Sequence, residues 1–261
     1  MRSIKLTIAY DGTAYCGWQR QPTQPTVQGT LELAWMNITG EEKRITGSSR
    51  TDAGVHALGQ VASVETESTL EAAVLQRALN AKLPDDIVVV DAADAPIGFD
   101  AIRDTRRKRY RYQIHNSTIR HVFGRTSWWH VPQPLDVFKM DRAGQTLVGT
   151  HDFASFQSSG SERESSVRTI YELAVTGQRQ EGAAAGQGRG GDWITICVEG
   201  DGFLYNMVRT IAGSLVEVGR GARPVEWMAD VLAAQDRKAA GPTAPPHALF
   251  LVRIDVGDRD S

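Results

Sequence analysis

The chain has 261 residues, 41% of them hydrophobic and 23% charged, which suits one large domain or two of about 100–150 residues and excludes a disordered chain. No apolar run approaches the ~18 residues that a membrane span needs, so we expect no membrane-spanning segment. The formal net charge of -2 disfavours nucleic-acid binding only as an average, because such binding depends on where the cations lie.

The cysteines and histidines give no sign of a metal site. Cys16 and Cys197 lack metal-ligand spacing, and two cysteines in a chain of this length suit a reducing cytosol. Residues 1–5 lead directly into a strand pattern and carry no secretory signal. We therefore expect a cytoplasmic protein without a metal, a nucleotide cofactor or a disulfide framework.

The first half of the chain predicts an α+β layer with its helices on one face. Apolar residues recur at every second position over residues 4–10, which predicts a strand that ends at an Asp-Gly turn. Thr26 is expected to cap a helix over residues 27–38. A capping box at residues 68–71 is expected to open a second helix, which stops before Pro84. The other expected strands cover residues 61–65, 87–91 and 108–115.

The second half of the chain repeats these ingredients. Helices are expected near residues 136–147, over 203–218 and over 224–234, and strands over 167–175, 193–198 and 249–256. The glycine-rich residues 177–191 predict a hairpin loop, because a phosphate loop would have to open into a helix. The two similar halves suggest a pseudo-duplicated architecture, with domains at residues 1–117 and 135–261 joined by a connection at 118–134.

The most informative segment is the small, polar run at residues 47–56. It places Asp52 between Arg50 and Gly54, shortly before a strand-like run, and so predicts a loop at the rim of a sheet. Glycine permits a backbone conformation that other residues resist, and the turn can then present the carboxylate outward. An aspartate here can be a nucleophile, a general base or a turn residue that bonds its own backbone, and the motif alone leaves these alternatives open.

A dense group of cations lies in the strand that ends the first half. The six basic residues are Arg103, Arg106, Arg107, Lys108, Arg109 and Arg111. Such cations can simply protect an edge strand from pairing, or they can contact a phosphate backbone without reading sequence. Tyr110 and Tyr112 alternate with them on the other face of the strand. We expect Tyr112 to lie in the hydrophobic core, whereas Tyr110 is a candidate to stack on a base.

A further cation lies in the helix expected over residues 203–218. Arg209 falls about 140° from Leu204 at ~100° per residue, away from the apolar stripe of that helix. It is either a surface arginine or a fixed positive charge that keeps a nearby carboxylate ionised.

Residues 50–57, Arg-Thr-Asp-Ala-Gly-Val-His-Ala, closely resemble the active-site signature of the tRNA pseudouridine synthase A family. The resemblance runs from end to end. Further segments match the family in order and spacing at residues 10–13, 17–21, 26–28, 83–87, 109–112, 203–209 and 249–252. Three positions depart from the family pattern: Ser49 replaces a glycine, Ile102 an arginine and Val256 an aromatic residue. The Ile102 departure implies the loss of one phosphate contact.

The resemblance implies the pseudouridine synthase fold, with two similar α/β-sandwich halves carrying mixed or antiparallel sheets around a central cleft. It also implies isomerisation of uridine to pseudouridine in the anticodon stem-loop of tRNA, at tRNA positions 38, 39 and 40. The N-glycosidic bond is broken and the uracil is rejoined through C5, without a cofactor. By the same analogy the protein acts as a homodimer on a flipped-out uridine.

The same resemblance implies roles for particular residues. Asp52 is the nucleophile or base acting at the sugar, and Arg209 pairs with it and keeps it charged. Arg50 holds the opened nucleotide or its phosphate, and Tyr110 packs against the uracil and serves in proton transfer. Leu249 and Leu251 supply an apolar wall. The six basic residues named above contact the RNA backbone.

Two other classes of protein share parts of this pattern. A non-catalytic RNA-binding module needs the basic strand and its tyrosines but not Asp52. A small-molecule N-glycoside hydrolase needs Asp52 but not the cluster of cations.

Overall fold

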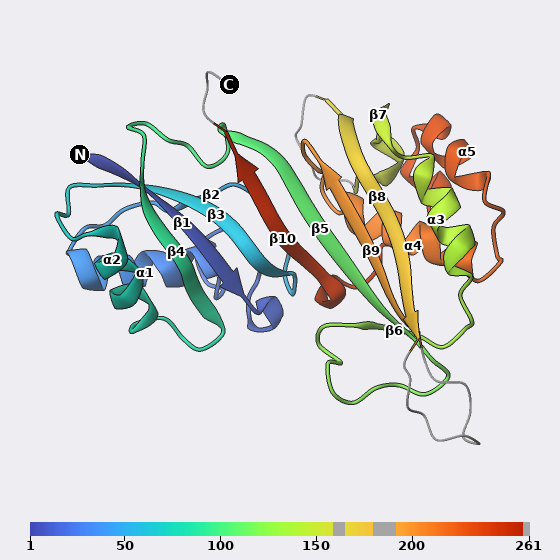
Figure 1. Cartoon of the computed structure of the whole chain (residues 1–261), viewed down its shortest axis with the longest axis horizontal. Coiled ribbons are helices and arrows are strands. Elements are labelled where there is room, and N and C mark those ends of the chain that lie inside the picture. Colours follow the sequence, from blue (N-terminus) through green and yellow to red (C-terminus); the bar gives the residue numbers. More distant parts are fainter. Residues whose placement is uncertain (159–164, 180–191, 258–261) are drawn as a thin grey trace. The chain divides into compact units, whose positions relative to one another are not determined.

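The computed structural model describes residues 1–158, 165–179 and 192–257 and separates the chain into two compact units (Figure 1). The first unit comprises residues 1–108 and 250–261, and the second comprises residues 109–249. Each unit combines strands with helices, which confirms the predicted α+β class. In the described part of the chain, no helix is both long and apolar enough to cross a membrane.

The sheet of the first unit is built around β1 (Arg2–Tyr10). Its inward residues, such as Ile4 and Leu6, are fully buried, as the alternating sequence predicts. The strands β3 (His56–Thr66) and β4 (Ile87–Ala95) pair with β1 in antiparallel fashion. The last strand, β10 (Leu249–Val256), adds to β3 in parallel, and the short β2 (Thr46–Gly47) pairs with β3 in antiparallel fashion.

Two helices complete the first unit. In α1 (Val27–Thr39), the Thr26 hydroxyl accepts a hydrogen bond from the Gly29 amide at 3.3 Å, which confirms the predicted cap. The helix α2 (Ala72–Asn80) packs on β4 and on α1 (Figure 1). The capping box predicted at residues 68–71 is wrong, because the Ser68 hydroxyl instead accepts from the Leu70 amide at 3.3 Å in a local turn.

The main strands of the second unit are hydrogen-bonded in the order β5-β9-β8-β7. The strand β5 (Thr105–Asn116) begins in the first unit and continues through the second, and the short β6 (Trp129–Val131) pairs with it in parallel. The strand β8 (Val167–Arg179) pairs in antiparallel fashion with β7 (Gly149–Asp152) and with β9 (Asp192–Gly200). Most of the loop predicted at residues 177–191 lies outside the described residues.

Three helices lie in the described part of the second unit. They are α3 (Val137–Gln145), α4 (Met207–Gly219) and α5 (Trp227–Ala234) (Figure 1). The helix expected from residue 203 begins four residues later, because Asn206 adopts a left-handed conformation with φ of 61°. The helix expected from Pro224 begins at Trp227, and the residues between form a turn in which the Trp227 amide bonds the Pro224 carbonyl at 3.2 Å.

The units divide inside β5, between Lys108 and Arg109, rather than in the connection proposed at residues 118–134. That segment contains β6 and lies within the second unit. The described residues also form short 3-10 helices between the larger elements: η1 (Gly12–Ala14), η2 (Ala154–Phe156), η3 (Arg237–Ala239) and η4 (Pro246–Ala248).

A histidine is buried near the end of β5 in the second unit. His115 is 5% exposed, and its ring lies 4.6 Å from the Trp193 ring and within 6 Å of the rings of His121 and His130. Burial, followed by the charges of His121 and His130, lowers the pKa of His115 below its ordinary value. Among the described residues, its Nδ1 atom has no hydrogen-bond partner, so a proton there is poorly accommodated.

We expect this histidine to make the folded state less stable in acid. The neutral ring is favoured in the fold, whereas the unfolded chain takes up the proton near pH ~6.5, so stability is full above that pH and falls below it. Thermal melting between pH 8 and 5 measures the effect. His115→Gln should show a shallower fall, and an unchanged slope in that variant would contradict the assignment.

Candidate active site

The loop that carries Asp52 connects β2 to β3 and is fixed by the sheet of the first unit. The Ser48 amide donates to the Val61 carbonyl at 2.8 Å. The Gln60 side chain, which is fully buried, bonds both sides of the Ser49 backbone, accepting from its amide at 3.2 Å and donating to its carbonyl at 2.6 Å. These two hydrogen bonds involve only the backbone of Ser49. The serine side chain, at a position where the sequence pattern has glycine, therefore leaves them intact.

The N-terminal segment holds the same loop from the other direction. The Trp18 amide donates to the Thr51 carbonyl at 3.0 Å, and the Tyr10 hydroxyl lies 2.7 Å from the Thr51 hydroxyl in a buried hydrogen bond. The Gly54 amide donates to the Tyr15 carbonyl at 3.3 Å. Because backbone groups on both sides of Asp52 are bonded to distant segments, the loop is a rigid platform rather than a free turn.

The turn itself has the geometry that the sequence predicts. Gly54 has φ of 78°, and the Val55 amide donates to the Asp52 carbonyl at 3.1 Å. Within this rigid loop Asp52 is half-buried and Arg50 is exposed, with the buried Thr51 between them. The loop therefore presents a carboxylate and a guanidinium from a fixed backbone.

Two glycines outside the motif allow the loop to come this close. A Cβ atom on Gly12 would lie 2.0 Å from the Val55 carbonyl oxygen. A Cβ atom on Gly17, which has φ of 87°, would lie 2.5 Å from the Thr51 carbonyl oxygen. Only glycine leaves room for the backbone of the Asp52 loop at these positions.

His56 lies at the end of the motif, where β3 begins. Its ring is 2% exposed and stacks on the Phe250 ring at 4.6 Å with an interplanar angle of 20°. Its Nδ1 atom lies 3.1 Å from the Gly12 amide nitrogen and 3.1 Å from the Asp11 carboxylate. Burial raises the pKa of Asp11, but the hydrogen bonds from Thr13 and the nearby histidine outweigh it and leave that pKa below its usual value. His56 thus helps to join the start of β3 to the turn after β1.

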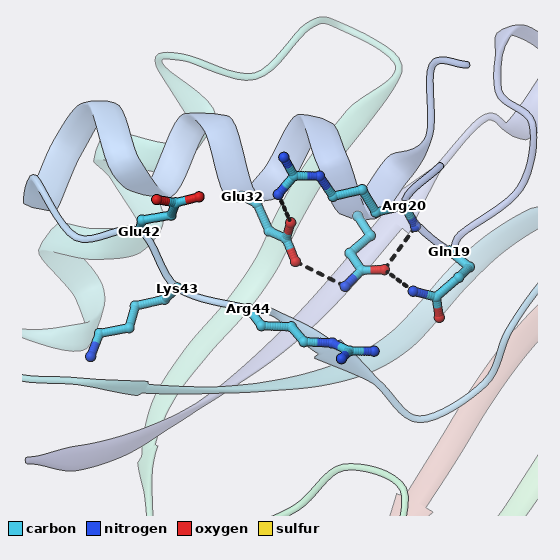
Figure 2. A pocket seen from close by; sticks show the side chains of 7 residues that line it. Gln19, Arg20, Glu32, Glu42, Lys43 and Arg44 are labelled. Atoms are coloured by element: carbon cyan, nitrogen blue, oxygen red, sulfur yellow. Dashed lines mark hydrogen bonds and ion pairs between the residues drawn. The ribbon is translucent and has the colours of Figure 1, made fainter. Parts of the chain in front are cut away.

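A polar cavity of about 500 Å³ opens in the first unit beside the start of α1 (Figure 2). Its lining residues are Gln19, Arg20, Gln28, Glu32, Glu42, Lys43 and Arg44. Glu32 is 8% exposed, and it accepts from Arg20 Nη1 at 3.0 Å, from Gln28 Nε2 at 2.8 Å and from the Ile45 amide at 3.1 Å. The buried carboxylate is therefore compensated by a cation and two further donors.

Gln28 extends this network towards the Asp52 loop. Its Oε1 atom accepts from the Arg20 amide at 2.9 Å and from Gln19 Nε2 at 2.8 Å. These residues directly follow Trp18, whose amide bonds Thr51, and the Gln28 amide donates to the Trp18 carbonyl at 3.0 Å. Residues that line the cavity thus attach the segment after Trp18, which supports the Asp52 loop, to α1.

In the second unit, the two tyrosines of β5 are both buried. Tyr112 is fully buried, as expected, and donates to the Pro245 carbonyl at 2.8 Å, while burial holds its pKa well above the usual value. Tyr110 is 6% exposed, and the Phe203 ring meets it edge-on at 5.2 Å. The candidate ring is thus held by an aromatic residue from the segment just before α4.

Arg209 projects from the first turn of α4 and is half-buried. Its Nε atom donates to the Ala244 carbonyl at 2.7 Å, and its Nη1 atom donates to Asn206 Oδ1 at 2.6 Å. These two hydrogen bonds hold the guanidinium in a defined orientation. The predicted wall residues, Leu249 and Leu251, are 6% and 0% exposed.

The six cations of the basic segment have different surroundings. Arg103 bonds the Asp104 carboxylate and the Gly98 carbonyl, and Lys108 donates to the Ser48 carbonyl at 2.8 Å. Arg109 forms ion pairs with Glu172 and Glu199. Of the remaining three, Arg111 is half-buried, whereas Arg106 and Arg107 are exposed. At least three of the six cations are thus engaged within the protein.

A family model described as tRNA pseudouridine synthase matches residues 6–103 and 143–255. The chain belongs to this family. The enzyme is therefore an isomerase that converts uridine to pseudouridine in tRNA. The resemblance noted in the sequence is confirmed. Among the residues that the structure describes, no cluster of three histidine, cysteine or acidic side chains is placed to hold a metal ion.

Three relatives, each named tRNA pseudouridine synthase A, match almost the whole enzyme. The protein of Thermoanaerobacter sp. (strain X514) is 44% identical and covers 97% of this chain and 99% of its own. The protein of Myxococcus xanthus is 43% identical, with 99% and 93% covered. The protein of Halalkalibacterium halodurans is 45% identical, with 98% and 93% covered. The family match therefore extends over both units.

Sequence reasoning missed the residues that support the loop. Gly12, Gly17 and Gln60 contact the Asp52 loop from positions 11 to 43 residues away along the chain, by backbone approach or by a buried amide. Their only signal in the sequence is that some of them lie in motifs shared with the family. Asn206 was likewise placed inside a helix, where its contact with Arg209 has no visible sequence pattern.

Proposed function

We propose that this enzyme forms pseudouridine at positions 38, 39 and 40 of the tRNA anticodon stem-loop, with Asp52 as the nucleophile. The observation that carries the proposal is the Asp52 loop, whose backbone is bonded on both sides of a half-buried carboxylate. A fixed, partly desolvated carboxylate suits capture of an electron-poor sugar carbon, as in retaining glycosidases.

The reaction is an isomerisation, in which one hydrogen of the uracil is exchanged with solvent. The bond from N1 to the sugar C1′ breaks and the detached uracil rotates. A bond from C5 to C1′ then forms, the C5 proton leaves to solvent, and N1 takes up a proton. The carboxylate of Asp52 can act through a sugar ester, through a glycal or by attack at the base, and each route loses the C5 hydrogen. Loss of that hydrogen is therefore the diagnostic event.

The proposal assigns the neighbouring chemistry to residues whose surroundings suit it. Arg50, exposed on the same loop, is assigned to the opened nucleotide or its phosphate. Tyr110 is assigned to the uracil, with Leu249 and Leu251 as apolar wall. Arg209 supplies the positive charge that keeps the reacting carboxylate ionised, a role that its two hydrogen bonds favour by fixing the guanidinium.

The test is release of tritium from tRNA labelled at C5 of uridine. Release into water with retention of uracil in the RNA is the expected result. Binding without release would support a non-catalytic RNA-binding module, and free uracil would support an N-glycoside hydrolase. Mapping the product within the anticodon arm tests the three positions. We also propose a cytoplasmic homodimer, which light scattering of the purified enzyme tests for its stoichiometry.

We predict that tRNA binding weakens steeply with salt. Contacts to phosphate release counterions, so each one adds about −0.7 to −0.9 to the slope of log affinity against log salt. Arg106 and Arg107 are adjacent, exposed residues of the basic segment, and the proposal assigns them the largest share. Replacing both by alanine should make the slope less negative by about 1.4–1.8, whereas Arg77→Ala on α2 should not change it. A slope that is flat in the wild type would remove the role of the basic segment.

A further inference from the structure

Asn206 has a backbone conformation that side chains rarely adopt. It precedes α4 with φ of 61° and ψ of 6°, in the left-handed region. Gln235, with φ of 49°, is the other non-glycine residue with positive φ in the described chain. Such strain persists only where the surroundings enforce it, and it concentrates at functional sites.

The side chain of Asn206 does not cap the helix that it precedes. Its Oδ1 atom accepts from Arg209 Nη1 at 2.6 Å, and its Nδ2 atom donates to the Ser158 hydroxyl at 3.1 Å. The Ser158 amide in turn donates to the Tyr205 carbonyl at 3.1 Å. One amide group therefore links the guanidinium of Arg209 to the segment that precedes β8.

The other side of the Arg209 guanidinium is fixed by the chain before η4. Arg209 and Ala244 exchange two hydrogen bonds, from Arg209 Nε to the Ala244 carbonyl at 2.7 Å and from the Ala244 amide to the Arg209 carbonyl at 3.1 Å. The segment before η4 packs directly on α4, because a Cβ atom on Gly213 would be 1.8 Å from the Pro242 carbonyl oxygen. The guanidinium thus has two anchors, a backbone carbonyl and the Asn206 amide.

We propose that Asn206 is a positioning residue that orients the Arg209 guanidinium for the reaction. The inference rests on the catalytic role proposed for Arg209. Asparagine suits the position for two reasons: it tolerates the left-handed conformation, and its amide both accepts from the arginine and donates to Ser158. Glycine would keep the backbone without the amide. Aspartate would accept from Arg209 but would add a negative charge beside the guanidinium and lose the donor to Ser158.

The decisive variant is Asn206→Gly, because it relieves the backbone and removes only the side-chain bonds. We expect kcat to fall about 10- to 100-fold, the change that corresponds to losing one hydrogen bond to a charged group, with KM for tRNA within about twofold. The acidic limb of the pH profile of kcat/KM should move to higher pH, because a misplaced cation holds the reacting carboxylate ionised less well. The matched control is Gln235→Gly, which relieves the same strain on an exposed residue and should leave kcat, KM and the pH profile unchanged.

Repeating the Asn206→Gly substitution in a second variant distinguishes a positioning role from a general effect on the structure. In an Arg209→Lys enzyme, which lacks the guanidinium fork, Asn206→Gly should cost much less than in the wild type. Ser158→Ala, which removes the anchor of the amide, should lower kcat in the same direction by a smaller factor. Full kcat in Asn206→Gly, or an equal loss in both backgrounds, would overturn the inference. Absence of pseudouridine formation by the wild type would instead overturn the proposed function.

Discussion

Asp52→Asn is expected to lower the rate of tritium release from C5-labelled tRNA by at least about 10⁴-fold, the loss typical when a nucleophile is removed. The amide is isosteric with the carboxylate but has no negative charge with which to stabilise or bond an electron-deficient C1′. The affinity for tRNA should stay within a few-fold, because the proposed backbone contacts are made by other residues. Single-turnover release, measured beside a binding titration, separates the two effects.

The variant should remain folded. The bonds that fix the loop use backbone atoms of Ser48, Ser49, Thr51 and Asp52 and the Thr51 hydroxyl, and all of these survive the change. We therefore expect the variant to give the same circular dichroism spectrum and a cooperative unfolding transition, as the wild type does. Asp91→Asn, on an exposed residue of β4, is the matched control and should retain full activity. An active, folded Asp52→Asn enzyme would contradict the assignment of the nucleophile.

The elements that the sequence predicted well are those whose signal is local and periodic. Thr26 caps α1 as expected, and Ile4 and Leu6 are buried as the alternation of β1 requires. The predictions failed where a polar side chain had a competing partner. Ser68 bonds a neighbouring amide instead of capping α2, and Asn206 leaves the helix in order to reach Ser158 and Arg209. Neither of these side-chain contacts can be read from a single sequence.

The candidate site shows the same division. The polar, glycine-containing run around Asp52 identifies the loop, and the turn at Gly54 has the predicted conformation. Its supports come from β1, from the segment after η1 and from β3, and each contributes a bond or a close approach that depends on tertiary packing. The surroundings of Arg109 depend on tertiary packing in the same way, since its acidic partners lie on β8 and β9, more than 60 residues away.

Gly12→Ala is the second change for which we expect a large effect, because it acts on the Asp52 loop through backbone alone. The added Cβ atom would lie 2.0 Å from the Val55 carbonyl oxygen and 2.7 Å from its carbon. Neither atom can rotate aside as a side chain could. The turn from Asp52 to Val55 must therefore shift, or the chain after β1 must, and overpacking of this kind costs about 3 kcal/mol.

Thermal melting should show this cost as a fall in Tm of roughly 6–12 °C for a chain of this size. Gly202→Ala is the matched control, since its Cβ atom would meet its nearest neighbour at an ordinary 3.5 Å. Activity distinguishes a displaced loop from simple instability. At temperatures well below its Tm, the folded Gly12→Ala enzyme should still release tritium much more slowly than the wild type, because the Val55 carbonyl cannot move without moving the turn that carries Asp52. A folded variant with wild-type activity would show that the Asp52 loop does not need the backbone position in which Gly12 holds it.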